Sequence, residues 1–197
     1  DLWPFDLRRF GAHKAQGRYL EARAVEAYGA YYKIHWPAEE THAGRDLRRS
    51  PLHAILAANG AVFGSRFGWE RPNWFRRPGV EAEERGSFEE RPGWFDAVAQ
   101  EVKAIRERAV LIDQTSFAKF EIAGPGAQDA LQRIAANDLS GEPGRAVYTQ
   151  LCNEKGGIEA DLTFVHVARD RFLCVTGSGF GVHDGNWIAR RLPAGVE

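Results

Sequence analysis

Three predicted strands near the C-terminus are joined by connections too short for a crossover, and this feature constrains the fold most strongly. The strands are expected at 146–152, 158–166 and 171–176. Short connections permit only antiparallel neighbours, because a parallel pair needs a crossover of a dozen or more residues. The sequence therefore predicts an antiparallel meander. The polar and glycine residues at 153–157 suit its first hairpin loop.

Apolar periodicity predicts helices around this meander. Apolar side chains recur every three or four residues between positions 95 and 109, which predicts a helix over 93–108. Together with the meander, these helices indicate an α+β fold. The remaining expected elements are helices at 18–34 (ending at Pro37), at 51–58, and from Gly124-Pro125 to near Asn137-Asp138; strands at 61–63, 110–112 and 117–123; an ordered aromatic loop at 67–75; and a tight turn after an edge strand at Gly177–Gly181.

A charged segment punctuated by proline and glycine separates two parts of the chain. Residues 76–93 read RRPGVEAEERGSFEERPG and offer no apolar period to bury. We interpret this segment as a linker between a first domain at 1–75 and a second at 94–197.

Charge and composition exclude several classes of function. The net charge is −1, so no overall field attracts nucleic acid or an anionic membrane. The longest nearly apolar stretch, 54–63, is too short to span a bilayer, which favours a cytoplasmic protein. The two cysteines, Cys152 and Cys174, show no metal-ligand spacing and are expected to be reduced and buried. The absence of methionine suggests that the chain is an excised fragment.

Few residues stand out as chemical groups from spacing alone. Turn chemistry is favoured at two places: Asn137-Asp138 at a predicted helix end, and Asn153-Glu154 at a hairpin loop. A carboxylate at a helix end, such as that of Asp138, can also orient an amine or stabilise a cation. The glycines at 177–181 lack the G-x-G-x-x-G spacing of a dinucleotide site. No histidine is paired with a nucleophile, and we assign none of them to catalysis.

A long, ordered string of residues resembles the opening of the glycine-cleavage T-protein (aminomethyltransferase) domain. Its segments are 101–119 (EVKAIRERAVLIDQTSFAK), 122–127 (IAGPGA), 131–138 (LQRIAAND) and 148–158 (YTQLCNEKGGI). Segments of the N-terminal half resemble the flavin-domain tail and central connecting domain of dimethylglycine/sarcosine dehydrogenases and oxidases. These are 6–10 (DLRRF), 19–23 (YLEAR), 44–53 (GRDLRRSPLH) and 67–75 (FGWERPNWF).

The resemblance implies a specific domain organisation. Residues 1–75 would be the flavin-domain tail and a small helical or irregular connecting domain. Residues 94–197 would be the N-terminal part of an incomplete folate-binding domain of antiparallel sheet and helices. The parent protein would be an FAD-dependent dehydrogenase of N-methyl amines that transfers the one-carbon unit to tetrahydrofolate. Its FAD would lie in an N-terminal domain outside this chain, so the chain's partners would be folate, a small substrate and the missing domains.

The resemblance also implies site residues. Asp138 falls on the family's catalytic aspartate, Asn153 on a pterin-contacting asparagine, Leu151 on a neighbouring main-chain contact, and Phe117 on a position beside the folate. The isolated chain is expected to bind folate weakly and to turn over nothing. Two alternatives stay open: a stand-alone folate-binding or scaffold protein of the T-protein fold, and an aminomethyltransferase of the glycine cleavage system.

Overall fold

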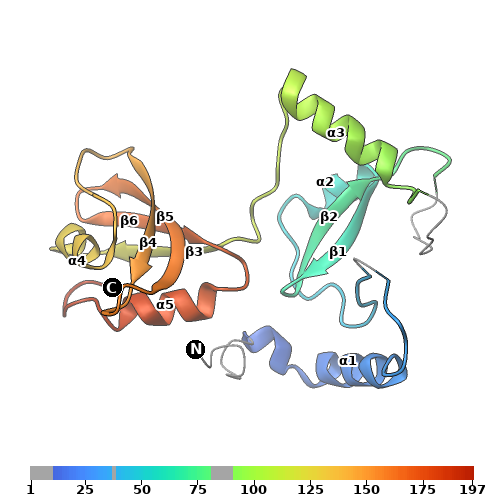
Figure 1. Cartoon of the computed structure of the whole chain (residues 1–197), viewed down its shortest axis with the longest axis horizontal. Helices are drawn as coiled ribbons and strands as arrows, with labels where there is room; N and C mark the ends of the chain where they lie inside the picture. The colour runs from blue at the N-terminus through green and yellow to red at the C-terminus, as the bar shows by residue number, and fades with distance from the viewer. Residues whose placement is uncertain (1–10, 37–38, 81–90) are drawn as a thin grey trace. The chain divides into compact units, whose positions relative to one another are not determined.

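The computed structural model describes residues 11–36, 39–80 and 91–197 (Figure 1). The predicted helix end at Pro37 and the middle of the predicted linker, 81–90, lie outside the described residues. The described chain forms two compact units, an N-terminal unit within 12–116 and a C-terminal unit at 117–197. The division between the units therefore falls downstream of the linker predicted at 76–93.

The N-terminal unit is built around a β-hairpin. Residues 67–75 were expected to form a loop, and this prediction is wrong, because 69–75 pair antiparallel with 61–66. Phe67 and Gly68 both have positive φ, as a two-residue hairpin turn of type I′ requires. Pro72 is tolerated because both strands of a two-stranded sheet have a free edge. The elements of this unit are a 3-10 helix (Ala12–Ala15), α1 (Gly17–Gly29), α2 (His53–Ala58), β1 (Ala61–Arg66), β2 (Trp69–Phe75) and α3 (Phe95–Glu107).

Helix α3 belongs to this unit and contacts β2, although the sequence predicts it to lie in the second domain. After it, the strand predicted at 110–112 is absent. The side chains of Val110, Leu111 and Ile112 are 46%, 88% and 59% exposed. Their β-propensity has no neighbouring strand to act on, because a strand forms only where a ladder partner is available.

The C-terminal unit is a four-stranded antiparallel sheet with two helices, which confirms the predicted α+β class and the meander (Figure 1). The strand order is β3-β6-β5-β4. Strand β6 is therefore interior, and the expectation that an edge strand precedes Gly177 is wrong. The helix at 181–189 was not expected. The elements are β3 (Ala118–Ala123), α4 (Ala127–Ile134), β4 (Ala146–Cys152), β5 (Ile158–Ala168), β6 (Arg171–Thr176) and α5 (Gly181–Ala189).

One face of this sheet carries the core. Alternate strand residues such as Leu151, Phe164 and Phe172 are fully buried together with Leu131 of α4 and Ile188 of α5. Burial of each such side chain stabilises the fold by about 1.5–3 kcal/mol. The core fixes the strand register, because a slip of one residue would turn every apolar side chain to the opposite face. No described helix is long and apolar enough to cross a membrane.

Candidate functional site

Asp138 lies beside the edge of β4. After α4 ends, the chain runs antiparallel to that strand, with a bridge between Ala135 and Leu151. The N–H of Ala136 donates to the carbonyl of Gln150 at 2.9 Å. The N–H of Asn137 then donates to Oγ1 of the buried Thr149 at 3.0 Å. The sheet edge thereby fixes the backbone on which the aspartate sits.

The Asp138 carboxylate is exposed and organises the loop that follows. Its Oδ1 accepts the N–H of Ser140 and its Oδ2 accepts the Ser140 hydroxyl, each at 2.8 Å. These two bonds, with weaker help from Arg145 and Gln132, hold the pKa of Asp138 below its usual value. The group is therefore ionised at neutral pH. The two Ser140 bonds take one lone pair of each oxygen.

Asn153 organises the β4–β5 hairpin loop. Its Oδ1 accepts the N–H groups of Lys155 at 3.0 Å and Gly157 at 2.9 Å. Its Nδ2 donates to Oε1 of Glu159 at 2.8 Å. Gly157 is required for this approach, since an added Cβ there would come within 2.9 Å of the asparagine amide. The turn chemistry favoured by the sequence is thus present.

Leu151 and Phe117 occupy different surroundings. The Leu151 side chain is fully buried in the core, so only its main chain is available to a ligand. Phe117 immediately precedes β3, which is at the opposite edge of the sheet from β4. Its carbonyl accepts Nζ of Lys119 at 2.9 Å.

The four predicted positions lie at separate places along the sheet. Asp138 lies level with about position 148 of β4, so Asn153 is five residues further along, or about 17 Å at strand spacing. Phe117 lies at the start of β3, which is three strands away from β4 across the sheet. Chemically the polar groups suit a folate: an ionised carboxylate at Asp138, and an amide at Asn153.

Sequence reasoning missed a polar chain that continues from Asn153 into the interior. Glu159 Oε2 is 3.8 Å from Nε2 of His183, whose Nδ1 is 2.8 Å from Oδ1 of Asp184. Asp184 Oδ2 accepts the hydroxyl of Thr176 at 2.5 Å, and both of these residues are buried. The only available signal was the adjacent His183-Asp184 pair, which lies in the helix that was not expected.

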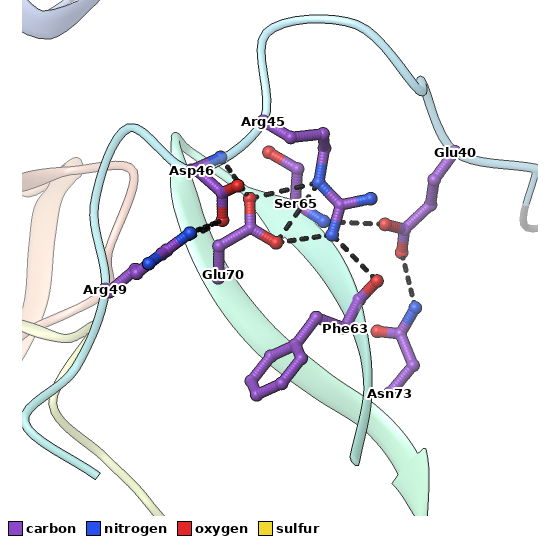
Figure 2. A network of polar contacts seen from close by, with 8 residues as sticks. All are labelled: Glu40, Arg45, Asp46, Arg49, Phe63, Ser65, Glu70 and Asn73. Atoms are coloured by element: carbon purple, nitrogen blue, oxygen red, sulfur yellow. Dashed lines mark hydrogen bonds and ion pairs between the residues drawn. The ribbon is translucent and has the colours of Figure 1, made fainter. Parts of the chain in front are cut away.

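The N-terminal unit holds a second polar network, shown in Figure 2. The carboxylate of Glu70 is 3% exposed and accepts Nε and a terminal N–H of Arg45 as well as the backbone N–H of Asp46. Arg45 also donates to the carbonyl of Phe63 at 2.8 Å. The network ties the segment before α2 to the hairpin. A shallow depression of about 620 Å³ beside it is lined in part by Arg49, His53 and Arg76.

Two family models match adjacent parts of the chain. Residues 52–197 match the family described as the GCVT N-terminal domain, and residues 1–50 match the FAD dependent oxidoreductase central domain. The two matches meet at 50–52, upstream of the linker predicted at 76–93. The family boundary thus differs both from that linker and from the division into compact units.

Similar proteins match most of the length of the chain. The chain is 47% identical over 173 residues to 4-methylaminobutanoate oxidase (formaldehyde-forming) of Paenarthrobacter nicotinovorans, covering 88% of the chain and 21% of the relative. It is 36% identical over 189 residues to mitochondrial dimethylglycine dehydrogenase of Rattus norvegicus, covering 95% and 22%. It is also 36% identical over 197 residues to the mitochondrial pyruvate dehydrogenase phosphatase regulatory subunit of Mus musculus, covering 98% and 22%. The chain thus spans about a fifth of these relatives.

A solved structure supports the fold. The glycine cleavage system aminomethyltransferase T from Bartonella henselae superposes with a TM-score of 0.58 and 24% identity, covering 77% of this chain and 37% of that chain. This likeness confirms the T-protein-like fold expected from the sequence.

Proposed function

Because this chain belongs to the GCVT N-terminal domain family, we propose that it contributes the folate-binding part of an FAD-dependent N-methyl amine dehydrogenase. In this proposal the parent protein oxidises an N-methyl amine with FAD and passes the one-carbon unit to tetrahydrofolate. The chain is the part that helps to bind the folate. Residues outside it hold the FAD.

One observation carries the proposal. A match to an FAD dependent oxidoreductase central domain leads directly into a match to the GCVT N-terminal domain. Two of the relatives are named for their action on N-methylated amino acids, 4-methylaminobutanoate and dimethylglycine. The substrate class proposed here is therefore an N-methyl amino acid, and its identity within that class depends on the flavin part.

The site residues keep distinct proposed roles. Bound tetrahydrofolate would supply the nucleophilic nitrogen that captures the one-carbon unit. The ionised Asp138 would stabilise positive charge at that centre, which is effective only where water is excluded. Asn153 would contact the pterin with its amide, and Leu151 with its main chain. Phe117 would offer an apolar surface from the start of β3.

The test uses the full-length protein that contains this chain. With sarcosine, dimethylglycine or 4-methylaminobutanoate as substrate, the bound flavin should be reduced by at least one of them. Free formaldehyde should then fall and 5,10-methylenetetrahydrofolate should rise when tetrahydrofolate is added. A formaldehyde yield unchanged by saturating tetrahydrofolate would refute the folate role.

The isolated chain offers a second measurement. Isothermal titration of the isolated chain should show weak tetrahydrofolate binding, and no turnover should be seen. Tight binding by the 197-residue chain would contradict this expectation.

A non-catalytic role is the second candidate, and the 36% identity to a phosphatase regulatory subunit favours it. The same parts would then serve as a regulatory or scaffold module. This candidate predicts no flavin reduction by any N-methyl amino acid, so the flavin assay separates the two functions.

The domain limits 1–75, 76–93 and 94–197 and the cytoplasmic location stay predictions. Two of the relatives named above are described as mitochondrial.

A further inference from the structure

The hydrogen bonds of Asn153 determine which of its atoms can meet a ligand. A side-chain amide has two acceptor lone pairs on its oxygen and two N–H donors. Both lone pairs of Oδ1 are used by the N–H groups of Lys155 and Gly157. One N–H is used by Glu159. One N–H donor therefore remains without a partner among the described residues.

Glu159 is what fixes this orientation. A carboxylate only accepts hydrogen bonds, so it can pair with Nδ2 but not with Oδ1. A flipped amide would place two oxygens against each other and two N–H groups against the loop donors. The bond is also charge-assisted, and such bonds are about twice as strong as neutral ones.

The position of Glu159 is itself constrained from two directions. It is the extra residue at the irregularity where Leu151 pairs with Ala160 but Cys152 pairs with Ile158. Its second oxygen lies 3.8 Å from His183. The imidazole is held by the buried Asp184, whose other oxygen accepts the hydroxyl of Thr176. The loop is thus connected to α5 and β6 through side chains.

We propose that Glu159, backed by His183, is a positioning residue that restricts Asn153 to a single hydrogen-bond donor toward the folate. The ligand atom that meets Asn153 is therefore an acceptor, such as the pterin carbonyl oxygen or an unprotonated ring nitrogen. This inference rests on the proposed function for its ligand, while the orientation of the amide does not depend on any ligand.

The orientation is tested without folate, by NMR of the side-chain amide of Asn153 in the 197-residue chain. In the unsubstituted chain, the proton facing Glu159 should be shifted downfield and exchange slowly with water. Glu159→Ala should abolish both signatures, and Glu159→Gln should restore them in part because its carbonyl still accepts. Glu154→Ala is the matched control, since it removes an exposed charge from the same loop and should change neither. Amide signals unaffected by Glu159→Ala would overturn the inference.

The ligand contact is tested in the full-length protein with 5-formyltetrahydrofolate as a stable probe. Asn153→Asp, which replaces the donor with an acceptor, should weaken binding at least tenfold. Glu159→Ala should weaken it several-fold and Glu154→Ala should leave it unchanged. Equal affinity of Asn153→Asp and the parent protein would overturn the acceptor assignment. No binding by the parent protein would refute the proposed function and this assignment with it, while the NMR result on orientation would stand.

Discussion

Asp138 accepts two hydrogen bonds from one residue, Ser140, through its backbone N–H and its hydroxyl, both at 2.8 Å. The same side chain therefore performs the loop-forming role favoured by spacing and still presents an ionised, exposed carboxylate. The two readings of Asp138 left open by the sequence are compatible. They can be separated by a substitution that removes the charge and keeps the bond from the Ser140 N–H.

Asp138→Asn is such a substitution, because its oxygen can still accept the N–H of Ser140, while its Nδ2 can donate to the Ser140 hydroxyl in place of accepting from it. In the full-length protein it should lower methylene transfer to tetrahydrofolate about a hundredfold, as loss of an electrostatic stabiliser does. Flavin reduction should keep its rate, because that step belongs to another site. Stopped-flow reduction and product analysis measure the two steps. Asp129→Asn, at the exposed start of α4, is the control. Equal loss of both steps would contradict a role confined to transfer.

Leu151→Ala should destabilise the C-terminal unit by about 2–5 kcal/mol, because it opens a cavity at a fully buried position. Hydrogen exchange of β4 and β5 amides measures this loss within the unit. Leu151→Ile keeps the volume and should cost less than about 1.5 kcal/mol. It should also leave folate affinity unchanged, since only main-chain atoms are proposed to contact the ligand. A large affinity loss in Leu151→Ile would contradict that proposal.

The meander was predictable because its information is local. Alternating side chains and short connections fix the direction of β4, β5 and β6 without knowledge of the rest of the chain. Strand β2 was missed because Pro72 reads as a breaker, and its tolerance depends on a free edge that only pairing reveals. Residues 110–112 failed in the opposite direction, since they have the composition of a strand and no partner.

The candidate site was predictable only in its residues. Turn chemistry at Asn153 and Asp138 follows from residue type and loop position. Nothing local indicates that Glu159 lies at a strand irregularity facing His183, because that contact joins residues 24 positions apart across the unit. Such a contact is set by tertiary packing. The donor role proposed for Asn153 therefore has no local signal in the sequence.

Cys174 should be unreactive in the folded protein. Burial, with a smaller contribution from Asp184, raises the pKa of its thiol to about 12, so the reactive thiolate is scarce at neutral pH. Cys152 is only partly buried. Iodoacetamide at pH 8 followed by mass spectrometry should find one alkylated cysteine, Cys152, in native protein and two after denaturation. Modification of both at equal rates under native conditions would contradict the buried position.

The buried imidazole of His166 should lower the free energy of unfolding relative to an apolar side chain at the same position. It is 6% exposed, stacks on Phe172 at 4.5 Å, and neither ring nitrogen has a hydrogen-bond partner among the described residues. A buried polar group without a partner costs about 1–3 kcal/mol. His166→Leu should therefore raise the free energy of unfolding by about 1 kcal/mol, measured by hydrogen exchange at β5. A loss of stability would indicate that the ring is satisfied by bound water.

The Arg45–Glu70 network should make the N-terminal unit sensitive to acid. Burial alone raises the pKa of Glu70, but the hydrogen bonds from Arg45 and the Asp46 N–H outweigh it and leave the pKa below its usual value. The folded state therefore holds its proton less tightly than the unfolded state. Stability from this group is fully present above the ordinary glutamate pKa and is lost as the pH falls through the lowered value.

Glu70→Gln tests this network (Figure 2). At pH 7 it should lower the free energy of unfolding by about 2 kcal/mol or more, because Arg45 loses its charged partner in a buried setting. The difference from the parent chain should shrink as the pH falls through the lowered pKa. Urea denaturation followed at the NMR signal of the buried Trp74 indole reports on this unit alone. Glu21→Gln, on the exposed surface of α1, is the control. It should change neither the free energy of unfolding at pH 7 nor its dependence on pH. A stability difference that stays constant between pH 7 and pH 3 would mean that the Glu70 carboxylate is not what holds the segment before α2 to the hairpin.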